Sequence, residues 1–512
     1  MHFPILTLIH LFPLFGGLFF LLLPSEKKTL LRWSAFFVSL VPFFLSLFLL
    51  FHFNRSESSL QFVEKFYWIP TIGADYFLAV DGLNLTMVLL ATFLIPLAIL
   101  SSFSVEKDVK TYMFLFLLLE TGTLGVFMAF NFFHFFLFWE VGLIPMFFLI
   151  KLWGSEDRDS AAFKFFVYTL FGSVAMLLAF QFMYLATKTF DFTELAALSR
   201  SGLLKADLVF LCRRLGLPFS PETVMAIGFF AVSIAFAIKV PIWPFHTWLP
   251  DAHTQAPTAG SMVLAGLLLK MGVYGFLRIA LPLFPDTVRS FAPLLAMFAL
   301  ASILFGAFAA MAQTDLKRMI AYSSINHMGY CMLGIFAIAA KGTLEPKASA
   351  LNGVLLQMFN HGISSAALFF MVGVLYERAH TRDLSKFGGI QKVMPVFAGL
   401  MGISTFSSLG LPGLNGFISE FLIFRGSFPL LTTFTLLATV GLLVTAVYLL
   451  TMIQKIFHGP LNEHHPAFPD MTTREIAVVV PLVILMFLVG IYPSPFLHVT
   501  NQAVLHFLEI FS

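Results

Sequence analysis

Residues 237–244 read AIKVPIWP, and residues 407–416 read SSLGLPGLNG. Both stretches place proline inside a long apolar run that would otherwise form one continuous helix. Proline lacks the amide hydrogen that an α-helix needs and clashes with the preceding turn, so it kinks or breaks the helix. The two stretches therefore predict two long apolar helices that are each interrupted by a break.

The composition indicates where such helices lie. The chain has 512 residues, of which 59% are hydrophobic and 11% are charged. Soluble domains carry roughly 45–50% apolar and about 25% charged residues. The low charge excludes a water-soluble enzyme built from several packed domains. In hydrocarbon, the backbone groups freed at a break are tolerated only where protein or water satisfies them.

The apolar runs predict an all-α polytopic membrane protein with about 14 transmembrane helices, since each needs about 20 apolar residues. The expected spans are residues 3–23, 31–53, 83–103, 111–130, 132–150, 161–186, 223–240, 257–280, 290–312, 319–339, 349–376, 394–424, 429–456 and 475–492. The apolar tail 496–511 is expected to lie at the membrane interface. The connection 187–222 mixes apolar and charged residues, which fits a helix on the membrane surface and an irregular loop equally well.

The two breaks also predict an internal repeat. Pro241 and Pro412 lie 171 residues apart, which is five spans of about 34 residues including their connections. Five is an odd number, so the second unit would be inverted relative to the first, with the breaks in the seventh and twelfth helices. The expected division is 1–110 (helices 1–3), 111–280 (first repeat, helices 4–8), 290–456 (second repeat, helices 9–13) and 457–512 (C-terminal loop, helix 14 and tail). Paired interruptions point to a transport site, although prolines can also kink membrane helices without further meaning.

Loop charges predict the orientation. Loops after odd-numbered spans hold about 16 lysines and arginines, and loops after even-numbered spans hold about 12, of which five lie in the 187–222 connection. The positive-inside rule then places the odd loops in the cytoplasm and both termini on the outer, periplasmic side. The run Phe3–Leu23 lacks an arginine-rich leader, so we expect a retained first span and a bacterial inner membrane rather than an organelle.

Several functional classes are excluded. A net charge of +3 is too small for a nucleic-acid-binding protein. The two cysteines, Cys212 and Cys331, form no CxxC motif, which excludes a disulfide framework and an iron–sulfur cluster held by this chain alone. The sequence holds neither a Walker A loop nor a dinucleotide fingerprint. We therefore expect no cofactor in this chain, and its energy must come from an ion gradient or a partner.

A small group of residues near the C-terminus has the composition of a metal site. Its members are His458, Glu463, His464 and His465. They lie in an expected loop without fixed ligand spacing, so we predict no metal site.

Five charged residues lie inside or beside apolar spans: Glu120, Glu140, Lys239, Lys270 and Glu420. Each would cost roughly 2.5–3.5 kcal/mol at the bilayer centre. Ion pairs that hold helices together are one explanation, but buried pairs seldom add net stability over apolar pairs. In a protein interior the pKa values of carboxyl and amino groups both move toward neutrality. The pattern therefore favours a path that translocates protons.

Two histidines lie in sequence between Lys270 and Glu420. His327 is near the middle of the expected tenth span and His361 near the middle of the eleventh. A lone histidine on an apolar helix is usually a packed core residue, but two on neighbouring spans favour a functional role. Because imidazole gains and loses protons near neutral pH, we expect both to connect the charged sites.

These residues carry a resemblance to a known family. The matching stretches are 138–145 (FWEVGLIP), 239–253 (KVPIWPFHTWLPDAH), 315–324 (DLKRMIAYSS), 376–378 (YER) and 380–382 (HTR). The chain resembles the antiporter-like membrane subunits of proton-pumping NADH:quinone oxidoreductase (respiratory complex I), and most closely the M type, called subunit 4 in mitochondria. The resemblance runs from about residue 75 to 460, or most of the chain.

The resemblance implies a fourteen-helix fold with two inverted five-helix repeats and broken seventh and twelfth helices. In that family the glutamate matching Glu140 pairs with the lysine matching Lys239. The lysine matching Lys270 carries protons inward along a hydrated central axis, aided by histidines like His327 and His361.

The position matching Glu420 ends the path to the outside in that family. It is usually lysine in the L-type and N-type relatives, so glutamate favours the M type, and Glu120 matches a second acidic position of M-type chains. The implied function is proton translocation driven by quinone reduction in partner subunits. The implied partners are the L-type and N-type membrane chains and a peripheral redox arm that carries the flavin and iron–sulfur clusters.

Two other readings remain open. The first is a subunit of a multisubunit sodium/proton antiporter, or of a relative driven by hydrogenase, formate or ferredoxin. The second is a scaffold that only holds neighbouring subunits in place. The row of charges inside the membrane favours a transporter over the scaffold.

Overall fold

The computed structural model describes residues 3–461 and 468–511. Within these residues eleven helices are long and apolar enough to cross a membrane. They are α2 (Lys28–His52), α3 with a short extension (Leu85–Ser104), α4 (Val109–Met128), α5 (Phe132–Trp153), α6 (Arg158–Thr187), α9 (Pro221–Lys239), α11–α13 (Thr258–Leu283), α14 (Pro285–Met311), α16 (Leu344–Ala379), α19 (Thr432–Phe457) and α20 (Thr473–Ile491). The remaining longer helices are α1 (Ile5–Phe20), α15 (Leu316–Ala337), α17 (Pro395–Leu409), α18 (Asn415–Ser427) and α21 (Ser494–Leu508).

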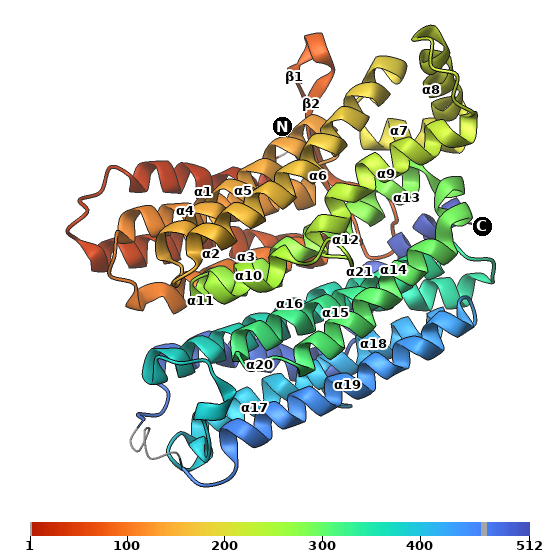
Figure 1. The fold of residues 1–512 in the computed structure, drawn as a ribbon. Helices are drawn as coiled ribbons and strands as arrows, with labels where there is room; N and C mark the ends of the chain where they lie inside the picture. The colour runs from red at the N-terminus through yellow and green to blue at the C-terminus, as the bar shows by residue number, and fades with distance from the viewer. Residues whose placement is uncertain (1–2, 462–467, 512) are drawn as a thin grey trace.

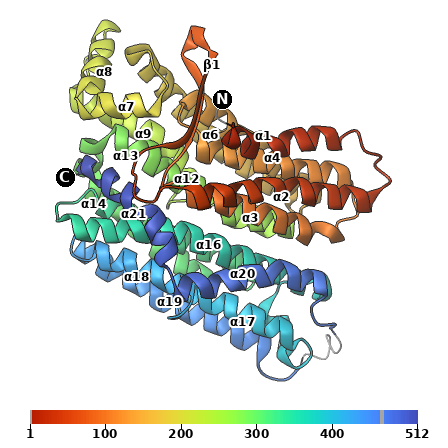
Figure 2. The same ribbon diagram turned by 180° about the vertical axis from the view of Figure 1, so that it is seen from behind.

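The helices run side by side in two groups (Figure 1). Helices α1 to α13 form one group and α14 to α20 the other. Helix α16 belongs to the second group and lies along its boundary with the first in both views (Figure 2). The apolar window of α16 is completely buried, whereas that of α2 at the edge is 28% buried. A helix that is buried on all sides can carry polar residues only where neighbouring helices supply partners. The candidate site is therefore expected along α16.

Both predicted breaks are present. Helix α9 ends at Lys239, and α10 (Trp248–Gln255) begins only after an irregular segment. Helix α17 ends at Leu409, and α18 begins at Asn415. Gly410 between them has φ +81°, a left-handed conformation that glycine adopts without strain.

The eighth expected span has an irregularity that the sequence did not predict. Between α11 (Thr258–Val263) and α12 (Leu269–Gly275) the helix widens into a π-helical turn at Leu264–Leu268, and a second one follows at Phe276–Ala280. π-helical turns are rare and occur often at functional sites because they re-aim the side chains that follow. Lys270 lies between the two.

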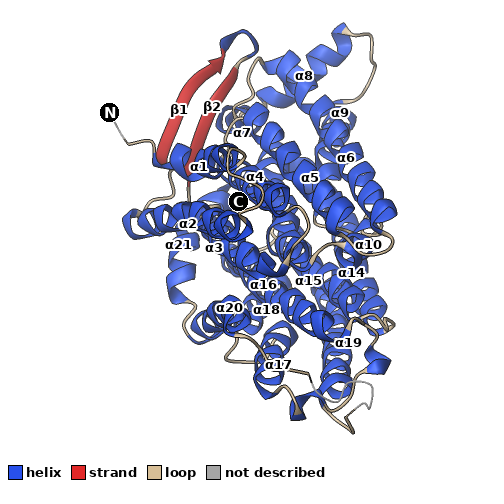
Figure 3. Ribbon diagram, turned by 90° about the vertical axis from the view of Figure 1, so that its left-hand side faces the viewer, coloured by secondary structure: helices blue, strands red, loops and turns tan. Residues whose placement is uncertain are grey.

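The expectation of an all-α chain was wrong at residues 61–80. There β1 (Gln61–Ile69) and β2 (Ala74–Val80) form an antiparallel hairpin beside α1 (Figure 3). The β1 sequence, QFVEKFYWI, is rich in aromatic residues, which favour strands. The search for 20-residue apolar runs passed over it because the stretch is short and carries charges.

The hairpin caps the first helix. The carboxylate of Glu64 accepts hydrogen bonds from the backbone amides of Leu6 (2.8 Å) and Thr7 (2.9 Å) and from the Thr7 hydroxyl (2.5 Å). The first amides of a helix have no partner within the helix, so the carboxylate satisfies two of them. Glu64 thereby joins β1 to α1.

Replacing Glu64 with alanine should lower the local stability of α1 by about 1–2 kcal/mol, because two buried amides lose their acceptor. Hydrogen exchange of the α1 amides should become faster, while that of α16 stays unchanged. The exposed Glu57 on the preceding loop provides the control, Glu57→Ala. Unchanged exchange in α1 would show that the cap does not stabilise it.

The connection 187–222, for which the sequence left a helix and a loop open, and the tail 496–511 are both largely helical. The connection 187–222 forms α7 (Phe192–Arg200) and α8 (Leu203–Arg214), which bury apolar side chains against the protein. The tail forms α21, which buries Val499, Ala503 and Phe507 and lies against α16. The helical alternative for the connection is therefore confirmed, and the tail packs on the bundle with one face.

Candidate functional site

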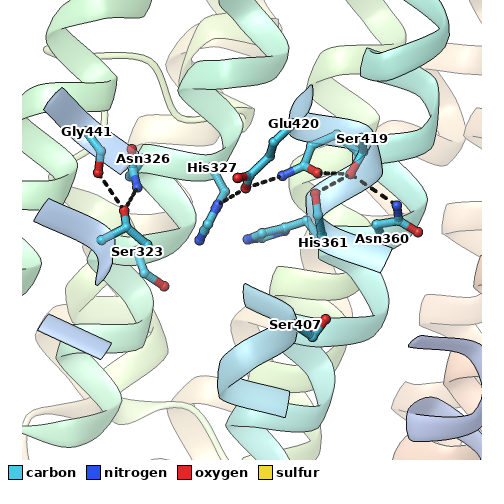
Figure 4. Close-up of polar contacts among 12 residues, drawn as sticks. Ser323, Asn326, His327, Asn360, His361, Ser407, Ser419, Glu420 and Gly441 are labelled. Atoms are coloured by element: carbon cyan, nitrogen blue, oxygen red, sulfur yellow. Dashed lines mark hydrogen bonds and ion pairs between the residues drawn. The ribbon is translucent and has the colours of Figure 1, made fainter. Parts of the chain in front are cut away.

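Four of the predicted site residues form a connected row in the centre of the molecule. Lys270 Nζ lies 2.7 Å from His361 Nδ1, and His327 Nδ1 lies 3.0 Å from Glu420 Oε1. The rings of His361 and His327 have their centroids 5.5 Å apart (Figure 4). The four residues come from four helices, α12, α16, α15 and α18, and none is more than 6% exposed. We call this row the central track.

The chemistry of each pair defines its donors. An ammonium group has only donors, so the charged Lys270 donates to Nδ1 of His361 and to the carbonyl of Ala265, 2.5 Å away in the π-helical turn. An ionised carboxylate has only acceptors, so His327 Nδ1 donates to Glu420. The track therefore runs from a base through two imidazoles to an acid.

A shell of amides and hydroxyls surrounds the acidic end, and the sequence reasoning missed it. Gln357 Nε2 lies 3.4 Å from Glu420 Oε1, and Ser419 Oγ donates to Gln357 Oε1 at 2.5 Å. Asn360 Nδ2 donates to Ser419 Oγ at 3.1 Å and to the backbone carbonyl of Asn415 at 2.7 Å (Figure 4). The last bond satisfies a carbonyl at the start of α18, directly after the break. Gln357 precedes His361 by one helical turn, and Asn360 and Ser419 adjoin predicted residues, so their positions were the available signal.

The predicted pair in the N-terminal half is not in direct contact. No ion pair within 4.0 Å joins Glu140 to Lys239 among the described residues, and neither Glu140 Oε1 nor Lys239 Nζ has a hydrogen-bond partner there. The Lys239 ammonium instead lies 4.8 Å from the ring centroid of Trp139. The two charges are close enough to interact electrostatically. The direct pairing implied by the family resemblance is thus replaced by a cation–π contact beside a separated carboxylate.

Glu120 is the remaining predicted acid in the N-terminal half. It is completely buried on α4, and both of its carboxylate oxygens lack a hydrogen-bond partner within the described residues. Two residues further on, Gly122 lies against the backbone of Gly142 on α5, where a Cβ atom would approach within 2.7 Å. Within the described residues, no hydrogen bond joins Glu120 to the central track.

Two basic residues that were not singled out extend the row beyond Lys270. His253 on α10 is fully buried and stacks on Phe369 with ring centroids 4.3 Å apart. Lys317 on α15 donates to the carbonyl of Ala256 and lines a cavity of about 110 Å³. His253 is close enough to both Lys317 and Lys270 for electrostatic interaction. Lys317 therefore joins this cavity to a group of buried basic side chains that includes Lys270.

The described residues contain no group of three or more side chains that could hold a metal ion. Of the compositional cluster near the C-terminus, Glu463, His464 and His465 lie outside the described residues.

Relatives of this chain are named as subunits of NADH-quinone and NADH-ubiquinone oxidoreductases. The chain is 43% identical to NADH-quinone oxidoreductase subunit M of Rhodobacter capsulatus, over 93% of this chain and 90% of that protein. It is 39% identical to NADH-ubiquinone oxidoreductase chain 4 of Chondrus crispus, over 99% of this chain and 98% of that protein.

Two solved structures have the same fold as this chain. A chain of respiratory complex I from Thermus thermophilus superposes with a TM-score of 0.85 at 28% identity, over 99% of this chain and 100% of that one. A chain of the Mrp complex from Dietzia shares the fold with a TM-score of 0.83 at 19% identity, over the full length of both chains. The family described as NADH:quinone oxidoreductase/Mrp antiporter, transmembrane, matches residues 129–446. This chain belongs to that family.

Proposed function

We propose that this chain is the M-type membrane subunit of a proton-pumping NADH:quinone oxidoreductase, and that it moves protons across the membrane. The proposed translocating residues are Glu120, Glu140, Lys239, Lys270, His327, His361 and Glu420. The observation that carries the proposal is the central track, in which four titratable side chains from four helices lie in one buried row. Uncompensated burial of so many titratable groups has a use in a proton path and none in a scaffold.

The geometry indicates how protons would pass. Across 2.7 Å, Lys270 hands a proton to Nδ1 of His361, and the imidazole releases one from its other nitrogen. The step to His327 crosses a gap between rings that a water molecule or a side-chain rotation bridges. His327 then protonates Glu420, whose amide shell stabilises the ionised form afterwards. Moving one charge against 100 mV takes about 2.3 kcal/mol, and quinone reduction in partner subunits supplies it.

The proposal includes a fold of fourteen transmembrane helices. Ten of them form two inverted repeats, residues 111–280 and 290–456. In the first, Gly122 lies on the backbone of Gly142, and in the second, Gly306 lies on the backbone of Asn326. The two members of each close contact are 20 residues apart in sequence. Each unit also holds one broken helix. The same close packing between the first two helices of each unit, α4 with α5 and α14 with α15, supports a duplicated unit.

The proposed partners are those that the family resemblance implies. We expect L-type and N-type membrane chains and a peripheral arm with flavin and iron–sulfur clusters, while this chain itself carries no redox centre. We place the chain in the bacterial inner membrane with both termini on the periplasmic side. The family also includes Mrp antiporters, so a sodium/proton antiporter subunit is the alternative.

Affinity purification of the tagged chain from its own membranes separates the two functions. We expect flavin and iron–sulfur absorbance in the purified complex and NADH:quinone turnover that needs no sodium. Copurification of membrane chains alone, without either cofactor, would identify an antiporter. Turnover that stops when sodium is removed would show that the complex does not couple to protons.

Gly410 offers a test of the end of the central track at Glu420. A Cβ atom there would lie 3.2 Å from Glu420 Oε2. Gly410→Ala should slow coupled turnover about tenfold, because a displaced reacting group transfers protons poorly. Gly413, with φ +93° and nothing within 4 Å of its Cβ position, gives the matched control Gly413→Ala, which adds the same backbone strain away from the carboxylate. Equal effects of both variants would assign the loss to backbone strain alone.

A further inference from the structure

An apolar groove opens on one side of the molecule. Helices α6 and α9 form its walls, and α8 closes its end; these three helices contact one another at the top of the molecule (Figure 1). The groove has a volume of about 390 Å³. Its lining is almost entirely apolar and includes Ala179, Phe182, Leu208 and Gly228.

The groove opens on the exposed apolar faces of α6 and α9. Both helices are long and apolar enough to cross a membrane, and Leu178 and Ile227 on the groove are 64% and 51% exposed. Leu178 precedes the end of α6 by nine residues, which correspond to about 14 Å along the helix axis. Half of the hydrocarbon thickness is about 15 Å. The groove therefore lies at the depth of the acyl chains of one leaflet.

Two arginines lie, in sequence, between the groove-lining residues Cys212 and Leu217. Arg213 and Arg214 form the last turn of α8, directly after Cys212, which lines the groove. Both are exposed, and no described residue forms an ion pair with either. Lys205 on the same helix is in contrast paired with Glu222 at 3.0 Å. The segment that closes the groove therefore carries two exposed positive charges that are available to an anion.

We propose that the groove binds an anionic phospholipid. One acyl chain fills the space between α6 and α9, and the phosphate lies against the guanidinium groups of Arg213 and Arg214. Guanidinium groups bind phosphate through paired hydrogen bonds, and the apolar walls suit hydrocarbon and nothing polar. The lipid would fasten the 188–220 connection to the bundle at the membrane surface.

Photocrosslinking tests the proposal in native membranes that contain the full chain in its complex. The probes are phosphatidylglycerol and phosphatidylcholine, each with a diazirine in one acyl chain. Phosphatidylglycerol should label peptides covering 175–183 and 224–231 at least severalfold more than phosphatidylcholine does. Arg213→Gln with Arg214→Gln should reduce its labelling to the phosphatidylcholine level, and Ala179→Phe should reduce labelling by both probes.

The matched control is Lys188→Gln with Arg200→Gln, which removes two exposed charges from the same connection away from the groove. Labelling should survive in this variant. Equal labelling by both lipids that the arginine variant does not change would overturn the anionic headgroup. Absence of label from the two groove peptides, or their crosslinking to another protein chain, would overturn the lipid site itself.

Discussion

Replacing Lys270 with methionine should lower coupled quinone reduction and proton pumping by about a hundredfold, the usual contribution of a positioned acid or base. Lys270 is the only base in direct contact with His361 among the described residues, so its loss removes the donor at the start of the central track. The complex should still assemble, because an apolar side chain of similar length replaces a buried charge at little cost in stability. Proton uptake into proteoliposomes and NADH oxidation by the assembled complex measure both effects.

Lys347 provides the matched control for this prediction. It is another buried lysine, 5% exposed, but it donates to the carbonyl of Phe511 and lies off the track. Lys347→Met should leave pumping within about twofold, since it touches no proton-transfer group. Normal pumping by an assembled Lys270→Met complex would favour the scaffold reading of this chain.

Glu140→Gln should have an effect of similar size. The substitution removes one charge while keeping the shape of the side chain, and Lys239 then faces Trp139 with no carboxylate nearby. A proton can no longer alternate between the two groups, so coupled turnover should fall about a hundredfold. Assembly should persist, because Glu140 Oε1 forms no hydrogen bond within the described residues, and the glutamine amide keeps an oxygen for the interaction with Ser173.

The matched control is Glu377→Gln, which makes the same substitution at an exposed glutamate near the end of α16, away from the proposed path. Turnover in that variant should match the unmodified complex. If Glu140→Gln also pumped normally, the N-terminal half of the proposed path would be wrong, while the central track would remain testable by itself.

Features that depend on local sequence could be predicted. Prolines at 241 and 412 remove amide hydrogens wherever they stand, so both breaks were found from the sequence. Charged residues stand out in apolar runs because burying them is costly. Lys270, His327, His361 and Glu420 were identified for that reason, and the structure brings all four together.

Features that depend on contacts between distant segments could not be predicted. Lys270 and His361 are 91 residues apart in sequence, and their contact is set by the packing of α12 on α16. The first π-helical turn beside Lys270 contains Gly266, but a single glycine in an apolar run does not distinguish it from a regular helix, and the second turn contains neither proline nor glycine. The separation of Glu140 from Lys239 likewise depends on where Trp139 packs.

The most direct test of the central track combines two conservative variants, Lys270→Arg and Glu420→Asp, each expected to slow pumping about tenfold. Residues that act as one unit lose little more when both are changed than when one is changed. The initial rate of proton uptake per assembled complex should therefore be about the same in the double variant as in the slower single variant. A double variant in which the two losses multiply, to about a hundredfold, would show that Lys270 and Glu420 do not serve one continuous path.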